Sequence, residues 1–253
     1  MPRVLVRPPS PRLADGELTH LDRVAVDADL AARQWRGYVD AWRDLGWTPV
    51  EVPAADEHPD GVFVEDAIVV FGGTAVLTSP GADSRRGELA TVAATVDRPD
   101  LDLRRIAAPA TLDGGDVLKV GRAVYVGRSA RTNEHGIEAL AAIVEPLGYR
   151  VHPVPVTRTL HLKSQVTALP DGTIIGWEPK VDDPSLFEPF LAVPEEHGTA
   201  VVVVDDATVL MSADAPRTVE MLRARGLTVV TVPITEFEKL EGCVTCLSVR
   251  LRD

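Results

Sequence analysis

The chain has 253 residues, of which 45% are hydrophobic and 25% are charged, and its net charge is −12. This apolar share supports a full core and excludes disordered and low-complexity proteins. The negative charge disfavours nonspecific nucleic-acid binding. No apolar run approaches the roughly 20 residues that span a bilayer, and the apolar stretch at the N-terminus is too short for a signal peptide. Two cysteines cannot form a disulfide framework, so we expect a cytoplasmic enzyme. The charge and the short apolar runs lead us to expect neither nucleic-acid nor membrane partners.

The first elements in chain order are a strand from Arg3 to Arg7, a helix from Asp27 to Leu45 and a strand from Thr48 to Val52. The helix carries its large apolar residues on roughly one face, and Gly46 follows it as a stop signal. This unit lacks one strand, which we expect from Cys243 to Leu251 at the other end of the chain.

Four hairpins follow, each made of two apolar strands around a short turn. The first runs from Ala67 to Thr78 around Gly72 and Gly73, and the others occupy residues 116–126, 164–177 and 200–211. We expect a helix and a further strand after each hairpin. The segments with this pattern are the helices Ser84–Val96, Thr132–Leu147 and Pro216–Arg225 and the strands Leu103–Ile106, Arg150–Val154 and Leu227–Val230.

The turns of the first three hairpins lie roughly 50 residues apart, about one-fifth of the chain. This period favours a circular array of one strand–strand–helix–strand unit. Pairing of the two chain ends would close the ring and remove open sheet edges. No linker rich in Gly, Ser or Pro divides the sequence, so we expect an α/β fold with a single domain from residue 1 to residue 253.

Two acidic stretches lie just before predicted strands. Leu112–Asp116 contains two aspartates separated by a glycine pair, and Pro59–Asp66 contains three carboxylates. Taken alone, each stretch is typical of a solvated acidic turn. In the second stretch Glu65 and Asp66 stand at the entrance of a strand, where neighbouring side chains point to opposite faces. At most one of these two carboxylates is therefore expected to face a given site.

One histidine and two cysteines also stand near predicted strands. His161 begins a strand, and a single histidine is usually a surface or core residue. Cys243 and Cys246 form a C-x-x-C pair, but we predict a strand there, in which residues i and i+3 diverge, so a redox pair is disfavoured. A zinc site needs three or four ligands, and the chain has no second cysteine pair. A thiol with a histidine and carboxylates elsewhere also fits a cysteine nucleophile.

Taken in order, these motifs resemble the dimethylarginine dimethylaminohydrolases of the guanidino-modifying, or pentein, superfamily. The resemblance spans the chain from about residue 60 to its end. It implies a five-bladed ββαβ propeller, in agreement with the repeat, and an N-terminal loop from Pro9 to Arg23 that covers the substrate. The matching stretches are FVED (63–66), PGADSRRGE (80–88), LDGGDVL (112–118), GRSARTN (127–133), LHLKS (160–164) and EKLEGCVTCLSV (238–249).

The resemblance also implies roles for individual residues, although none for Cys243. Cys246 would be the nucleophile, His161 the general acid and base, and Asp113 the group that orients His161. Asp66 would bind the guanidinium, with Glu65 close by. The other substrate contacts would be Arg85 and Arg131 at the α-carboxylate, Asp60 and the carbonyls of Leu18 and Leu240 at the α-amino group, and Phe63 at the alkyl stem or guanidinium face.

The implied reaction is hydrolysis of Nω-methylated arginine to citrulline and an amine, without a metal or other cofactor. The Cys246 thiolate would attack the guanidinium, and water activated by His161 would hydrolyse the resulting S-alkylthiouronium. An arginine deiminase or an amidinotransferase on the same fold is the nearest alternative. Deiminases carry His-x-Asp where this chain has Lys163, which favours methylated substrates. A non-catalytic arginine binder and a thiol-redox protein are further alternatives, and a homodimer is left open.

Overall fold

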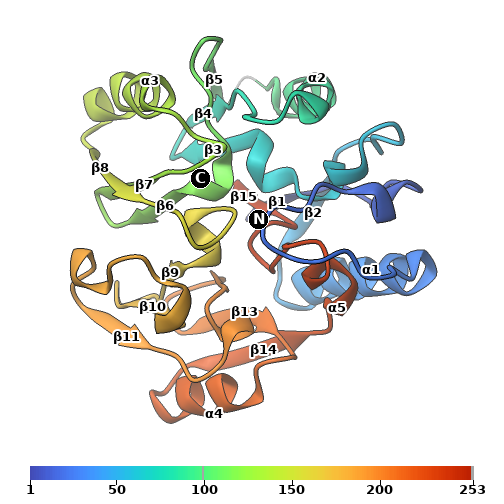
Figure 1. Cartoon of the computed structure of the whole chain (residues 1–253), viewed down its shortest axis with the longest axis vertical. Helices are drawn as coiled ribbons and strands as arrows, with labels where there is room; N and C mark the ends of the chain where they lie inside the picture. The colour runs from blue at the N-terminus through green and yellow to red at the C-terminus, as the bar shows by residue number, and fades with distance from the viewer. Residues whose placement is uncertain (99, 252–253) are drawn as a thin grey trace.

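The strands form five three-stranded sheets that surround a common axis like the blades of a propeller (Figure 1). The structure is a computed structural model that describes residues 1–98 and 100–251. In every sheet the middle strand pairs antiparallel with one neighbour and parallel with the other. This arrangement confirms the five-bladed α/β propeller that the sequence predicts.

One blade joins the two ends of the chain. Strand β1 (Arg3–Val6) pairs antiparallel with β15 (Val249–Leu251) and parallel with β2 (Thr48–Glu51). Helix α1 (Ala28–Asp44) connects β1 to β2. The predicted pairing of the chain ends is thus confirmed, and it closes the ring between the first and last blades.

The other four blades follow in chain order, and each begins with one of the four predicted hairpins, all of which are confirmed. Their strands are β3 (Ile68–Phe71), β4 (Thr74–Leu77) and β5 (Asp102–Arg105); β6 (Val117–Val120), β7 (Ala123–Arg128) and β8 (Arg150–Pro155); β9 (Val166–Ala168), β10 (Ile174–Gly176) and β11 (Phe190–Ala192); and β12 (Val201–Val203), β13 (Thr208–Ser212) and β14 (Thr228–Val232). The helices are α2 (Leu89–Val96), α3 (Glu134–Val144), α4 (Pro216–Ala224) and α5 (Thr235–Glu238).

Two segments differ from the expectation. Between β10 and β11 the described residues form single 3₁₀ turns at 178–180 and 184–186 instead of a helix, because Pro179 and Pro184 lack the N–H that a continuous helix needs. The predicted strand from Cys243 to Leu251 is wrong in its first half, since strand β15 begins only at Val249. The preceding residues form a turn, in which the Cys246 N–H donates to the Cys243 carbonyl at 3.1 Å.

Helix α1 shows how the local sequence sets the limits of an element. The Asp27 carboxylate accepts the Leu30 N–H at 2.9 Å and so caps the N-terminus. Beyond the C-terminus Gly46 has a φ of +79°, a left-handed conformation that glycine adopts without steric cost. Between these limits Tyr38 and Trp42 are fully buried, as the predicted apolar face requires.

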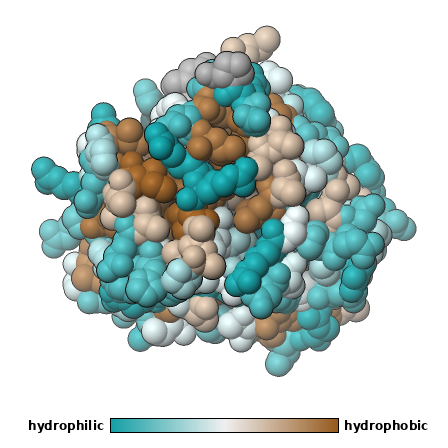
Figure 2. All heavy atoms as spheres, turned by 90° about the horizontal axis from the view of Figure 1, so that it is seen from above, coloured by the Kyte–Doolittle hydropathy of each residue, from teal (hydrophilic) through white to brown (hydrophobic). Residues whose placement is uncertain are grey.

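The outer surface mixes polar and apolar residues. On the face shown in Figure 2, apolar residues gather toward the upper edge, and hydrophilic side chains surround and interrupt them. Among the described residues, no helix combines the length and the apolar character that crossing a membrane would require.

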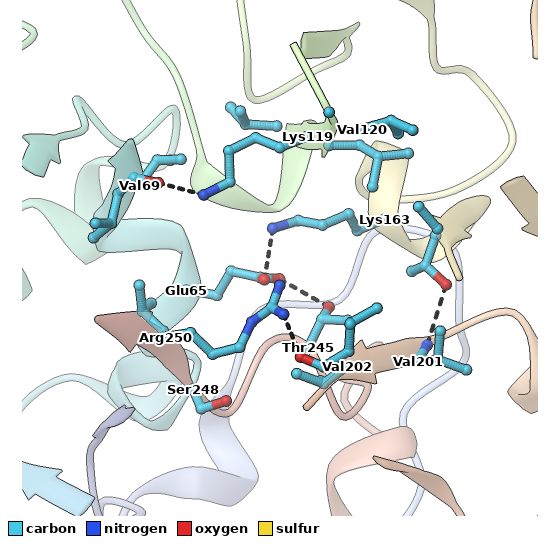
Figure 3. A pocket seen from close by; sticks show the side chains of 18 of the residues that line it. Glu65, Val69, Lys119, Val120, Lys163, Val201, Val202, Thr245, Ser248 and Arg250 are labelled. Atoms are coloured by element: carbon cyan, nitrogen blue, oxygen red, sulfur yellow. Dashed lines mark hydrogen bonds and ion pairs between the residues drawn. The ribbon is translucent and has the colours of Figure 1, made fainter. Parts of the chain in front are cut away.

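The first strand of each hairpin, together with β15, surrounds a central cavity of about 410 Å³ (Figure 3). Valine is the commonest residue in its walls, but charged side chains reach into it. Arg250 donates a hydrogen bond to the Val203 carbonyl, and Lys163 forms an ion pair with Glu65 at 2.5 Å. These contacts connect blades that are far apart in the sequence.

Tyr38 connects helix α1 to the turn that precedes β15. Its buried hydroxyl lies 2.8 Å from the Val244 carbonyl and 2.7 Å from the Ser248 hydroxyl. Replacement by phenylalanine keeps the ring but leaves these buried groups without their partner, so we expect Tyr38→Phe to lower the free energy of unfolding by about 1–3 kcal/mol. Urea denaturation measures the change. The matched control, Tyr125→Phe on a half-buried ring in β7, should cost less than about 0.5 kcal/mol. A Tyr38→Phe protein as stable as the unaltered chain would contradict this role.

Candidate active site

A small pocket lies where segments before several blades meet the N-terminal loop. Its volume is about 20 Å³, which is room for about one water molecule. Three residues with predicted roles, Asp113, Glu65 and Leu18, do not line it. The residues with predicted roles that do line it are Asp60, Phe63, Asp66, Arg85, Arg131, His161, Leu240 and Cys246.

The His161 ring is buried beside two aspartates. Its Nε2 lies 3.0 Å from Asp113 Oδ2, and its Nδ1 lies 3.7 Å from Asp66 Oδ1. Burial alone would lower the pKa of the imidazole, but Asp66 and Asp113 outweigh burial and raise the pKa of His161 to about 9. Burial would likewise raise the pKa of Asp66, but His161 and Arg85 lower it to about 2. At neutral pH the pocket therefore holds an imidazolium next to a carboxylate.

The glycine pair beside Asp113 brings the backbone close to the histidine. This stretch is buried, so its interpretation as a solvated acidic turn is wrong. A Cβ on Gly115 would lie 2.5 Å from His161 Nδ1, and the Gly115 N–H donates to Asp66 at 2.9 Å. Asp113 accepts the Gly81 N–H at 2.9 Å with one oxygen and contacts His161 with the other. Asp113 thus has the contacts expected of a group that orients the histidine.

The neighbours Glu65 and Asp66 face different cavities. They lie in the 3₁₀ turn Val64–Ala67 rather than at the start of a strand, but the expected divergence of their side chains is present. Asp66 lines the small pocket, whereas Glu65 lines the central cavity and pairs there with Lys163 (Figure 3). Glu65 also accepts the Thr245 hydroxyl at 2.9 Å. Burial raises the pKa of Glu65, and Lys163 opposes that rise. A contact of Glu65 with the guanidinium stays a prediction.

Arg85 lies at the centre of a buried ion-pair network. Its guanidinium binds Glu88 through two hydrogen bonds, of 2.9 and 2.8 Å, and Asp66 through one of 2.5 Å. It also donates to the backbone carbonyls of Asp60 and Phe63. Because the protein engages most of these donors, a two-pronged grip on a substrate carboxylate would require the contacts to rearrange. That role of Arg85 stays a prediction.

Arg131 binds a carboxylate that belongs to the protein itself. Its guanidinium lies 2.9 Å from Glu17 Oε2, and the Glu17 N–H donates to Asp60 Oδ2 at 3.1 Å. Glu17 therefore contacts Arg131, which is predicted to bind the α-carboxylate, and Asp60, which is predicted to bind the α-amino group. Sequence reasoning missed Glu17, because its partners lie 114 and 43 residues away along the chain. The one sequence signal for a role of Glu17 was its position in the loop that is expected to cover the substrate.

Glu241 holds the N-terminal loop over the pocket, and it too was missed. Its carboxylate accepts the backbone N–H groups of Thr19 at 3.0 Å, of Leu21 at 2.9 Å and of His20. Glu241 has a φ of 60°, an uncommon conformation for a residue other than glycine. Leu18 packs against the apolar cluster around α1. Glu17 brings this loop to the pocket wall, and the covering of a substrate by residues 9–23 stays a prediction.

The two cysteines lie side by side, so the predicted divergence of their side chains is wrong. The turn that replaces the predicted strand places Cys243 Sγ 3.4 Å from Cys246 Sγ. Cys246 lines the pocket, whereas Cys243 lines a neighbouring cavity. The hydrogen bond with Cys243 and burial raise the pKa of Cys246, while the same hydrogen bond lowers the pKa of Cys243. The Cys243 N–H also donates to Cys246 Sγ at 3.4 Å.

Among the residues that the structure describes, two clusters offer ligand atoms within 4.8 Å of one another and have the composition of metal sites. In the cluster within the pocket, Arg85 already supplies a cation to Asp66, and a protonated His161 is not a metal ligand. This arrangement fits acid–base chemistry better than metal binding. The clusters are Asp66, Asp113 and His161 at the pocket, of which Asp113 lies behind the lining, and His197, Asp214 and Glu238 outside it.

Comparison with known proteins agrees with this geometry, although no protein-family model matches the chain. The N(G),N(G)-dimethylarginine dimethylaminohydrolase of Streptomyces coelicolor is 56% identical over 251 residues, 99% of this chain and 97% of the relative. A solved structure of the Pseudomonas aeruginosa dimethylarginine dimethylaminohydrolase, a Cys-to-Ser variant with citrulline, matches with a TM-score of 0.91 at 33% identity over 98% of both chains. A His-to-Gly variant of such an enzyme, as an adduct with S-methyl-L-thiocitrulline, has a TM-score of 0.90 at 32% identity over 98% of this chain and 99% of the other. This chain therefore belongs to the dimethylarginine dimethylaminohydrolase family.

Proposed function

We propose that this chain hydrolyses Nω-methylated arginines, such as asymmetric dimethylarginine and monomethylarginine, to citrulline and an amine. The observation that carries the proposal is the pocket in which Cys246, the His161 imidazolium and the Asp66 carboxylate converge. Attack on a guanidinium requires a strong nucleophile, an acid for the leaving amine and an anion that binds the cation. We further propose that residues 1–253 act as one catalytic domain.

In the proposed complex, the two ends of the substrate bind at different charged groups. Asp66 binds the guanidinium through charge-assisted hydrogen bonds, and Arg131 binds the α-carboxylate in place of Glu17. Since the closed pocket holds about one water molecule, substrate entry requires the N-terminal loop to move. The remaining contacts are Asp60 and the carbonyls of Leu18 and Leu240 at the α-amino group, Phe63 at the alkyl stem, Glu65 near the guanidinium, and Arg85 as a second cation near the carboxylate.

The reaction begins when Cys246 Sγ attacks the guanidinium carbon as a thiolate and forms a tetrahedral adduct. The bound cation favours the thiolate and so opposes the raised pKa of Cys246. The His161 imidazolium, oriented by Asp113, gives its proton to the departing amine, and an S-alkylthiouronium remains on Cys246. Neutral His161 then accepts a proton from water as the water oxygen attacks the same carbon. Collapse of this second adduct releases citrulline and the Cys246 thiolate, and the proton of its hydroxyl passes to solvent, where the freed amine takes one up.

An arginine deiminase or an amidinotransferase on the same fold is the second candidate function. Deiminases have an aspartate at the position of Lys163, and this aspartate helps to grip the guanidinium nitrogens. Here Lys163 is a cation that pairs with Glu65 and accepts no hydrogen bond. One guanidinium nitrogen therefore has no aspartate to satisfy at this position, and methyl groups can occupy the space beside it. This arrangement favours methylated substrates over arginine.

We also propose that the enzyme is cytoplasmic and that its partner is a small-molecule substrate. Both cysteines are free, which suits a reducing compartment. The homodimer stays a prediction.

Substrate choice is the first test. Citrulline release is measured at subsaturating substrate. The kcat/KM for monomethylarginine or asymmetric dimethylarginine should exceed that for arginine by about ten-fold or more, which is the order of the free energy of one charged hydrogen bond. Agmatine, which lacks the α-carboxylate, should be poor. The control Cys246→Ser should bind substrate but release no citrulline, because a hydroxyl is a far weaker nucleophile. Equal or better processing of arginine would assign the chain to the deiminases.

The rate should also depend on the protonation of His161. The imidazolium is present below its pKa of about 9 and is lost above it, so kcat/KM is expected to fall as pH rises through about 9. Asp113→Asn removes one of the groups that raise this pKa and should move the fall to lower pH. A pH–rate profile of both proteins measures this, and a profile that keeps its alkaline limb unchanged in Asp113→Asn would contradict the assignment.

The two arginines of the pocket should behave differently. Arg131→Ala removes a charge-assisted hydrogen bond to the α-carboxylate and should raise KM by about 10- to 100-fold. Its nearest partner Glu17 is 41% exposed and its contact with the buried Asp113 is longer, at 3.7 Å, so the stability cost should be smaller than that of Arg85→Ala. Arg85→Ala removes the cation that lies closest to the buried Asp66 and Glu88 carboxylates and should lower the free energy of unfolding by about 3–5 kcal/mol. Steady-state kinetics and urea denaturation separate the two effects, and an Arg131→Ala enzyme with an unaltered KM would refute the carboxylate assignment.

A further inference from the structure

Cys243 has no part in the mechanism, yet its sulfur lies 3.4 Å from the sulfur of the nucleophile Cys246. We propose that the two cysteines form a reversible oxidation site, in which a peroxide converts the two thiols into an intramolecular disulfide. The disulfide removes the nucleophile and stops hydrolysis until a thiol reductant restores both cysteines. The loss of activity rests on the proposed function of Cys246, whereas the disulfide itself does not.

The turn provides the geometry that a disulfide needs. A Cα separation below 7 Å across a β-turn falls in the range that disulfides span, and the Cys246 N–H to Cys243 carbonyl bond closes such a turn. Moving the sulfur atoms from 3.4 Å to a bond of about 2 Å requires rotation of the side chains but no movement of a blade. Tyr38 holds the Val244 carbonyl between the two cysteines. The folded protein therefore already holds the two cysteines in a turn that can accept a disulfide.

Cys243 is also the thiol that a small oxidant can reach. It is half-buried and lines a cavity of about 90 Å³, room for several water molecules, while Cys246 is buried on the substrate pocket. Gly242 lies between the two cavities and lines both of them. A peroxide therefore approaches Cys243 by a path that does not pass through the substrate pocket.

The electrostatics set the order of the two steps. The hydrogen bond shared by the two thiols lowers the pKa of Cys243 and raises that of Cys246, and Cys243 is also the more exposed sulfur, so Cys243 reacts first. Its thiolate attacks a peroxide oxygen, breaks the O–O bond, and becomes a sulfenic acid while the peroxide leaves as an alcohol or water. Cys246 Sγ then attacks the sulfenic sulfur, its proton leaves with the hydroxyl as water, and the S–S bond forms. Two thiols lose two electrons, and one peroxide is reduced. Two exchange steps with a dithiol reverse the change.

The test oxidises the purified full chain with hydrogen peroxide and follows intact mass, free thiols and citrulline release. The unaltered chain is expected to lose two hydrogens in mass and both free thiols, to lose activity in proportion, and to regain it with dithiothreitol. Cys243→Ser and Cys243→Ala should both keep the basal activity. After peroxide, however, each should keep its Cys246 thiol and its activity longer than the unaltered chain, because the thiol that the peroxide reaches first is absent and Cys246 is buried.

Two results would overturn the proposal. One is an oxidised chain that gains oxygen atoms without losing two hydrogens. The other is peroxide inactivation of both Cys243 variants as fast as that of the unaltered chain. Intact mass and thiol counts do not depend on turnover, so a disulfide in a chain that releases no citrulline would support the oxidation site while contradicting the proposed function.

Discussion

The charges around His161 are buried together and balance one another. Asp66 and Asp113 contact the imidazolium, Arg85 pairs with Asp66, and Glu88 pairs with Arg85. Removing one partner from such a buried pair leaves an uncompensated charge and costs about 3–5 kcal/mol. Folding therefore fixes His161 and Asp66, the proposed acid and the proposed guanidinium-binding carboxylate, before substrate arrives. Stability and chemistry depend on the same contacts, so a substitution in this network is expected to change both.

The propeller brings together the proposed reactive groups from four different blades. Asp66 precedes β3, Asp113 precedes β6, His161 precedes β9 and Cys246 precedes β15. These four strands line the central cavity, so the residues just before them gather around the axis. Closure of the ring by β1 and β15 brings Thr245 to hydrogen-bond Glu65, which is 180 residues earlier in the chain. The fold thus assembles the site from segments that each contribute one or two side chains.

Local signals predict most of this architecture, because apolar alternation and turn residues mark the four hairpins, the helices and the closure of the ring. The sequence-based predictions fail where contacts between residues far apart in the chain determine the local structure. An apolar segment such as the one around Val244 fits a strand or a buried turn equally well, and the Tyr38 hydroxyl helps to hold the turn. The contact of Glu17 with Arg131 joins residues 114 positions apart, and no periodicity encodes it. Resemblance names Arg85 as a substrate ligand, but only the structure shows how many partners it already has.

The central claim is that neighbouring aspartates keep His161 charged inside the protein. The most direct measurement is an NMR titration of the His161 imidazole in the unliganded chain, with His161→Asn used to assign the signal. The account predicts a pKa of about 9. Titration near the ordinary value of about 6.5 would contradict it, because the imidazole would then be largely neutral at physiological pH and could not serve as the acid.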